Sequence, residues 1–226
     1  MLAALLAGCG GASGPATVYA AASLTDVFPQ IDAKAHYSFA GSDTLAAQIE
    51  QGAQPDVYAS ANEKLMDELR AKGLVEQPSV FATNRLVVVV PRSNPAHVTS
   101  IRDLARPGVK VVLAEAGVPA GDYARQAFAK LGLKVKPVSD EPDVRSVLAK
   151  VALGEADAGI VYATDARTVA SKVKVVELPQ AAQVEARYTI AVVKDAPHGD
   201  SGKAFVAAVE SQAGRRKLQA AGFGTP

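Results

Sequence analysis

RLVVVVP, residues 85–91, is the strongest strand signal in the sequence. A continuous apolar run of this kind is typical of a strand that is buried on both faces. A second run of similar character, ARYTIAVVK at residues 186–194, lies near the other end of the chain. Two long strands that bracket the middle of the sequence indicate that the chain crosses twice between two parts of the molecule.

The segments before and between these two runs alternate between strand and helix patterns. Alternation of this kind predicts parallel sheets covered by helices. We therefore expect two α/β lobes. The expected strands, besides the two runs, are residues 17–22, 36–40, 56–60, 109–114, 158–162 and 173–177, and the expected helices are residues 24–31, 44–51, 62–72, 120–131, 143–153, 201–211 and 214–221.

The composition is that of a compact globular protein. The chain has 226 residues, of which 49% are hydrophobic and 21% are charged, so neither disorder nor a fibrous repeat is favoured. The formal net charge is +1, and Lys and Arg alternate with Asp and Glu along the chain. Without a basic stripe, nucleic acid is not an expected partner.

The first nine residues, MLAALLAGC, form an apolar stretch that is too short to span a bilayer. They are typical of the end of a signal sequence, although the usual basic residues are missing. LAGC at residues 6–9 resembles the lipobox of bacterial lipoproteins, in which the chain is cut before a Cys that carries the lipid. We therefore interpret residues 1–15 as a signal-peptide remnant with a lipobox and a tether, and Cys9 as the lipid-modified residue. The alternative is a chance Cys in an apolar leader, and because the chain has a single Cys an internal disulfide is excluded.

The motifs of common enzyme classes are absent from the sequence. The three His residues stand in unrelated settings, and none belongs to an HExxH motif. No GxSxG elbow, GxxxxGK phosphate loop or GxGxxG fingerprint occurs, so hydrolase, nucleotide and dinucleotide chemistry lack their usual parts. We therefore expect neither an enzyme nor a cofactor.

Four expected helix starts carry clear start signals. Ser23 and Ser42 are natural N-cap residues, and the other two starts are PAG at residues 119–121 and DVR at residues 143–145. Each start presents unpaired backbone N–H groups and a partial positive charge, so several at one cleft would hold an anion without Arg or Lys. Open α/β sheets bind ligands at the carboxyl ends of their strands, where these starts lie. A single N-cap Ser, however, is usually structural and binds nothing.

A family resemblance connects these helix starts to a ligand site. Six motifs follow one another along the chain: AAASLTDV at 20–27, FAGSDTLA at 39–46, QPDVYASA at 54–61, VPAGDYA at 118–124, DVR at 143–145 and GEADAGIVY at 154–162. In this order they resemble the periplasmic molybdate-binding proteins. The resemblance implies a type II periplasmic binding protein fold, in which two crossover strands join two α/β lobes around a ligand cleft. Lobe I would comprise residues 16–85 and 187–226, and lobe II residues 86–186.

The resemblance also implies a set of oxyanion contacts. Ser23 and Ser42 would bind through hydroxyl and backbone N–H groups, Ala120 and Val144 through backbone N–H groups, and Tyr162 through its hydroxyl. No side chain is expected to coordinate a metal directly. The implied ligand is molybdate or tungstate, and the implied partner is the membrane permease of an ABC importer. The protein would be a monomer in the periplasm or on the outer face of the cell membrane, held there by its lipid.

Two departures from the family pattern and three rival functions remain at this point. The segment between Ser23 and Ser42 is short and contains Pro29, which predicts a truncated first helix. Asp43 places a carboxylate beside the expected dianion site, where it would repel the ligand unless it points away, and Arg145 is expected to form a structural ion pair rather than to bind the anion. The rivals are a receptor for sulfate, phosphate or an organic acid, an enzyme, and the effector domain of a transcription regulator.

Overall fold

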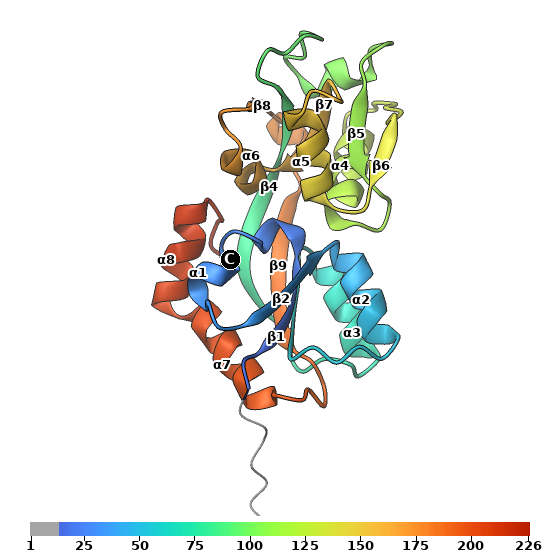
Figure 1. The fold of residues 1–226 in the computed structure, drawn as a ribbon. Helices are drawn as coiled ribbons and strands as arrows, with labels where there is room; N and C mark the ends of the chain where they lie inside the picture. Colours follow the sequence, from blue (N-terminus) through green and yellow to red (C-terminus); the bar gives the residue numbers. More distant parts are fainter. Residues whose placement is uncertain (1–13) are drawn as a thin grey trace, which may run out of the picture.

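Two lobes lie one above the other and are joined by two long strands (Figure 1). The computed structural model describes residues 14–226, so the predicted lipid-modified Cys9 lies outside the described residues. The joining strands are β4 (Ser79–Pro91) and β9 (Glu185–Val192), which pair antiparallel with each other. They contain the two apolar runs, and Val87 to Val90 of β4 are 0% exposed. The predicted double crossover is therefore present.

Lobe I is built on a sheet of strand order β2-β1-β3-β9-β4. Its strands β1 (Thr17–Ala21), β2 (His36–Ala40) and β3 (Val57–Ser60) run parallel, and β9 runs antiparallel to β3. Parallel neighbours require a crossover, and the alternating sequence supplies a helical segment after each strand. Their carboxyl ends consequently meet at the edge of the sheet that faces lobe II.

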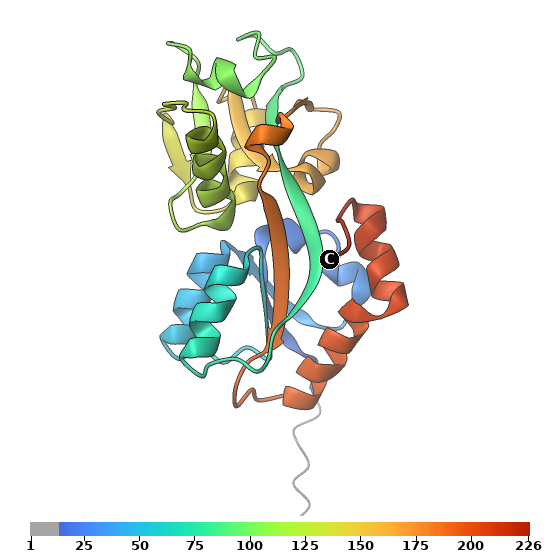
Figure 2. The ribbon, with the colours of Figure 1, turned by 180° about the vertical axis from the view of Figure 1, so that it is seen from behind.

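The helices of lobe I cover both faces of this sheet, as Figures 1 and 2 show. α2 (Ser42–Glu50) and α3 (Glu63–Ala71) pack on one face, where Leu45, Met66 and Leu69 are 0% exposed. The other face is covered by α1 (Phe28–Ile31), α7 (Gly199–Glu210) and α8 (Gln212–Ala221).

Lobe II is assembled around the second half of β4. That half pairs antiparallel with β7 (Ala158–Tyr162) and with β8 (Val173–Glu177). β5 (Val111–Ala114) then runs parallel to β7 on one side and to β6 (Ser139–Glu141) on the other. The remaining elements are α4 (Pro119–Lys130), α5 (Val144–Ala152), α6 (Ala163–Thr168), η2 (Ile101–Ala105) and η3 (Gln180–Ala182).

The first expected helix is shorter than its sequence pattern suggests. Residues 24–31 do not form one helix; a single 3-10 turn, η1 (Ala22–Leu24), is followed by the four-residue α1. Pro29 lies at the start of α1, where a missing N–H is tolerated, and it separates this short helix from the preceding turn. The truncation predicted from Pro29 is confirmed. None of the helices in residues 14–226 combines the length and the hydropathy that a membrane span requires.

Candidate ligand-binding site

A small cavity lies between the lobes, at the carboxyl ends of strands from both. Its volume is about 210 Å³, and this includes open solvent at its mouth. A ligand of a few atoms therefore suits it. The cavity is lined by residues that include all five predicted contacts: Ser23, Ser42, Ala120, Val144 and Tyr162.

Ser42 lines this cavity from the start of α2. The residue is 1% exposed, and its Oγ accepts a hydrogen bond of 3.0 Å from the backbone N–H of Ala61. Because the oxygen already accepts from the protein, its own hydrogen is left to donate. The prediction that Ser42 is an N-cap is wrong: Gly41 is the N-cap of α2 and Ser42 is the first helical residue. The physical reason is that the Ser42 side chain bonds the strand beside it rather than its own helix.

Ser23 lies on the same side of the cavity, in the middle of η1. The prediction that Ser23 is an N-cap is also wrong, because the turn begins directly at the end of β1 and Ala21 is the N-cap. Ser23 is 3% exposed, and its Oγ lies 2.8 Å from the hydroxyl oxygen of Tyr188. Its hydroxyl thus has one protein partner behind the cavity.

Two residues of lobe II line the cavity at helix starts, where backbone N–H groups have no intrahelical partner. Asp143 caps α5 by accepting hydrogen bonds from Arg145 N–H at 2.7 Å and Ser146 N–H at 3.0 Å. The N–H of Val144, the first helical residue, does not bond to the Asp143 carboxylate and has no intrahelical partner. Ala120 is the second residue of α4, whose N-cap offers no side-chain hydrogen bond.

Gly121 allows α4 to start this close to its strand. A Cβ atom at this position would lie 2.3 Å from the carbonyl oxygen of Ala114 and 2.2 Å from that of Glu115, and both are backbone atoms. A side chain would therefore push α4 away from β5. The PAG motif thus combines a proline suited to a helix start with a glycine that brings the N–H of Ala120 to the cavity.

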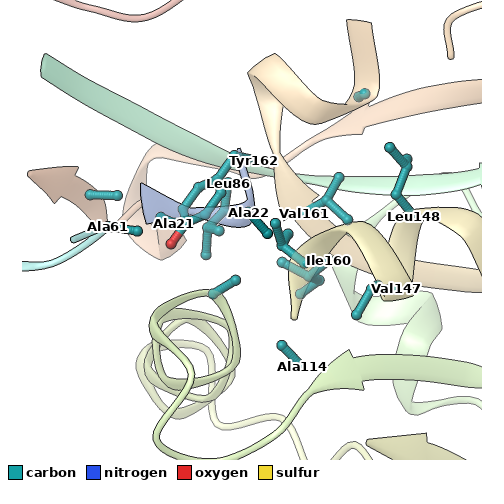
Figure 3. Packing of buried hydrophobic residues seen from close by; sticks show 14 of the residues in the cluster. Ala21, Ala22, Ala61, Leu86, Ala114, Val147, Leu148, Ile160, Val161 and Tyr162 are labelled. Carbon is teal, nitrogen blue, oxygen red and sulfur yellow. The ribbon is translucent and has the colours of Figure 1, made fainter. Parts of the chain in front are cut away.

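Tyr162 brings a buried phenol from lobe II toward lobe I. It is 1% exposed, and among residues 14–226 its hydroxyl has no hydrogen-bond partner. Burial raises the pKa of Tyr162 well above its ordinary value, so the phenol stays neutral and can donate. Figure 3 shows the ring close to Ala21, Ala22 and Ala61 of lobe I, and all four residues line the cavity.

Charged side chains near the cavity are engaged elsewhere. Arg145 pairs with Asp26 of lobe I, and its Nε lies 2.7 Å from Oδ1 of Asp165, so the predicted structural ion pair is confirmed. Asp43 does not line the cavity. Burial raises the pKa of Asp43, and the nearby carboxylates of Glu115 and Asp122 raise it further.

The arrangement suits an acceptor-only anion. Its donors are three hydroxyls and helix-start N–H groups. The one carboxylate in its lining, Asp143, already accepts hydrogen bonds from the start of α5. Its lining includes no Lys or Arg, and within residues 14–226 no cluster of three His, Cys, Asp or Glu could hold a metal ion. The five predicted residues are brought together, but their contact with a ligand stays a prediction.

Comparison with known proteins agrees with this geometry. Residues 16–224 match the family of bacterial extracellular solute-binding proteins. The molybdate-binding protein ModA of Mycobacterium bovis is 42% identical over 248 residues, which cover 100% of this chain and 95% of that protein. The chain belongs to this solute-binding protein family. A Bacillus subtilis relative, named as an ABC transporter substrate-binding lipoprotein, is 33% identical over 222 residues and matches 92% of this chain and 85% of its own length.

The fold of this solute-binding protein also matches the folds of solved structures. The periplasmic molybdate-binding protein of Azotobacter vinelandii superimposes with a TM-score of 0.81 at 20% identity, covering 93% of this chain and 99% of that one. The predicted type II periplasmic binding protein fold is therefore confirmed.

Several residues behind the site were not predicted. Ala61 supplies the N–H that occupies Ser42, and Gly41 lets the lobes approach. Tyr188 and Asn84, on the two joining strands, contact each other behind Ser23. The available signal was a polar side chain inside an otherwise apolar strand run, as at Tyr188.

Proposed function

We propose that this solute-binding protein captures molybdate, and tungstate equally, outside the cytoplasm and delivers it to the permease of an ABC importer. The observation that supports this most directly is the small cavity, which is surrounded by neutral donors from both lobes. The likeness to ModA adds the identity of the anion. The protein acts as a monomeric receptor and catalyses no reaction.

The proposed contacts explain the choice of a fully deprotonated anion. The oxygens of a tetrahedral dianion can only accept hydrogen bonds, and Ser23, Ser42 and Tyr162 offer hydroxyls whose hydrogens are available to it. The N–H groups of Ala120 and Val144 add the positive ends of two helices. Buried donors of this kind favour an anion that needs no acceptor from the protein.

Binding in this site is coupled to the closure of the lobes. Ser23 and Ser42 belong to lobe I, whereas the other three proposed contacts belong to lobe II. The full set of donors exists only when the lobes come together, so the ligand favours the closed form by its differential affinity. A closed receptor is the form that a permease would recognise.

Calorimetry with purified protein tests both the anion and its contacts. We expect molybdate and tungstate to bind with similar affinity, and sulfate and phosphate much more weakly. Ser42→Ala and Tyr162→Phe each remove one hydrogen bond to a charged group, so molybdate affinity should fall about 10- to 150-fold. Tyr37→Phe is the matched control, since the Tyr37 hydroxyl bonds the carbonyl oxygens of Phe28 and Asp32 within lobe I.

The outcomes separate the anion from the residues. Sulfate binding as tight as molybdate binding would replace the proposed ligand by the alternative tetrahedral oxyanion. Unchanged molybdate affinity in both site variants, with wild-type melting curves, would remove Ser42 and Tyr162 from the site.

A further inference from the structure

A chain of hydrogen bonds lies behind Ser23 and runs through both joining strands. Tyr188 of β9 is 0% exposed, and its hydroxyl oxygen lies 2.8 Å from Ser23 Oγ. Asn84 of β4 is 6% exposed, and its amide nitrogen Nδ2 lies 3.5 Å from the same Tyr188 oxygen. Nδ2 also donates to Thr164 Oγ1 at 2.8 Å. The chain therefore connects lobe I, the two joining strands and lobe II.

The orientation of the Asn84 amide is fixed by its own backbone. Its Oδ1 accepts a hydrogen bond of 2.9 Å from the N–H of Arg85. The opposite end of the amide, which faces Thr164 and Tyr188, must then be the nitrogen. An amide nitrogen can only donate, so the oxygen of Tyr188 receives a hydrogen from Asn84.

The hydroxyl hydrogen of Tyr188 consequently has one direction in which to point. Among the described residues, Ser23 Oγ at 2.8 Å is the acceptor within hydrogen-bond distance of the Tyr188 hydroxyl, whereas the nearby Tyr162 hydroxyl forms no hydrogen bond. Leaving a buried hydroxyl hydrogen without an acceptor is costly, so Tyr188 donates and Ser23 accepts. Burial also raises the pKa of Tyr188 well above its ordinary value, which keeps this hydrogen in place.

We infer that Tyr188 and Asn84 are specificity-determining positioning residues: Asn84 fixes the Tyr188 hydroxyl, and Tyr188 donates to the Ser23 oxygen and so holds the Ser23 hydrogen toward the ligand. The inference rests on the proposed place of Ser23 in the anion site. An anion that carries a hydrogen must donate it to some acceptor. Tyr188 donates to Ser23 and Ala61 N–H donates to Ser42, so the hydrogens of both serines are left to point at the ligand and would meet the hydrogen of such an anion. The one carboxylate that lines the cavity, Asp143, already accepts from the N–H groups of Arg145 and Ser146 and from the Ser146 hydroxyl.

Tyr188→Phe tests this inference because it removes one hydroxyl and keeps the ring. The ring packs edge-on against Phe81, Tyr162 and Phe223, with centroids 6.1, 5.7 and 5.4 Å away. We expect molybdate affinity to fall about three- to tenfold. Inorganic phosphate, titrated at a pH where it carries a hydrogen, should lose less affinity or gain some, because the Ser23 hydroxyl is then no longer held as a donor to the ligand. The preference for molybdate over phosphate should therefore decrease. If Tyr188 acted through packing alone, the variant would bind both anions more weakly by the same factor, and this result would overturn the inference.

A double-mutant cycle with Ser23→Ala shows whether Tyr188 acts through Ser23. Once Ser23 has lost its hydroxyl, adding Tyr188→Phe should change molybdate affinity by less than about twofold. Independent, additive losses would overturn the inference while leaving the proposed function intact. If Ser23→Ala alone binds molybdate as wild type does, the proposed site itself fails at this residue. Tyr37→Phe serves again as control and should leave the ratio of affinities unchanged.

Discussion

Asp43 is the residue that least suits an anion site, because it follows Ser42 directly. Its carboxylate turns back toward Gly41, as a Cβ atom built on that glycine would lie 2.6 Å from Asp43 Oδ1. The negative charges of Glu115 and Asp122, both in lobe II, contribute to the raised pKa of Asp43. Closure therefore brings like charges of the two lobes together, which opposes binding.

Asp43→Asn should consequently bind molybdate more tightly than the wild type. A repulsion equivalent to one pKa unit corresponds to about tenfold in affinity, which is the upper end of the expected gain. The sign of the pH dependence follows from the raised pKa of Asp43: a proton is bound more readily in the closed form, so acid favours closure. The advantage of the variant should thus shrink as the pH falls through the pKa of Asp43.

Calorimetry of both proteins across an acidic to neutral pH series measures this, and comparing them at each pH cancels changes in the anion itself. Asp67→Asn, on the exposed face of α3, changes the net charge equally and should leave the affinity unchanged. Equal affinity of the Asp43 variant and the wild type at every pH would show that the carboxylate does not act on the ligand.

Among the elements, the start of α2 and the turn before α5 approach each other closely across the cleft. A Cβ atom on Gly41 would lie 2.6 Å from the carbonyl oxygen of Pro142, which belongs to lobe II. The φ of Gly41 is −56°, a value that any residue adopts. The glycine is therefore needed for the approach of the lobes and not for the backbone of the helix start.

Gly41→Ala should hinder closure without unfolding lobe I. An added methyl group at a tight contact costs about 1 to 3 kcal/mol, so molybdate affinity should fall about 5- to 150-fold. Small-angle scattering should show less compaction on adding molybdate than in the wild type. Gly199→Ala, where a Cβ atom would meet nothing within 4 Å, is the control. Normal compaction and affinity in the Gly41 variant would show that the lobes bind the anion without this close approach.

A second contact between elements is the ion pair that Arg145 of α5 forms with Asp26, in the segment before α1. Asp26 is 54% exposed and Arg145 24%, so solvent screens the pair and its contribution is about 1 kcal/mol or less.

Asp26→Asn should speed molybdate release by up to about fivefold, measured by stopped flow, because the pair forms across closed lobes. Asp140→Asn removes the comparable Arg125 pair inside lobe II and should not change the rate. Equal release rates in all three proteins would show that the pair with Asp26 does not hold the lobes closed. Arg145 would then act only within lobe II, through its pair with Asp165.

Sequence patterns predicted the elements that bury apolar residues and missed those that do not. The run of valines in β4 is sufficient to predict a buried strand. β6 is the polar triplet SDE and α6 has six residues, so neither carries a period long enough to be read. The contacts of the site depend on the packed chain: Ser23 and Tyr188 are 165 residues apart in sequence. The resemblance could therefore name Ser23, but the direction of its hydroxyl required the structure. The predicted boundaries between the lobes stay a prediction.

At the scale of the whole molecule, the described chain begins at the end of lobe I that lies away from lobe II (Figure 1). Cys9 precedes Gly14 by five residues, a length that reaches at most about 18 Å when extended. A lipid on Cys9 would hold lobe I near the membrane surface and leave lobe II free to move over the cleft.

Cys9→Ser should release the protein from the membrane fraction of its native host, because the residue that would carry the lipid is gone. The purified variant should bind molybdate with unchanged affinity, since residues 14–226 form the cavity by themselves. Membrane association that persists in the variant would contradict lipid attachment at Cys9.

The position of β9 also governs the order in which the protein can fold. β9 is the last strand to be synthesised, yet in the sheet it lies between β3 and β4, with Val192 opposite Val57. Pairing between such distant segments is slow, because a long loop must be closed before the contacts form. Lobe II occupies one continuous stretch of chain and can form while synthesis continues. Lobe I, whose sheet is incomplete until β9 arrives, is then the last to become native, so its first three strands wait for the end of the chain.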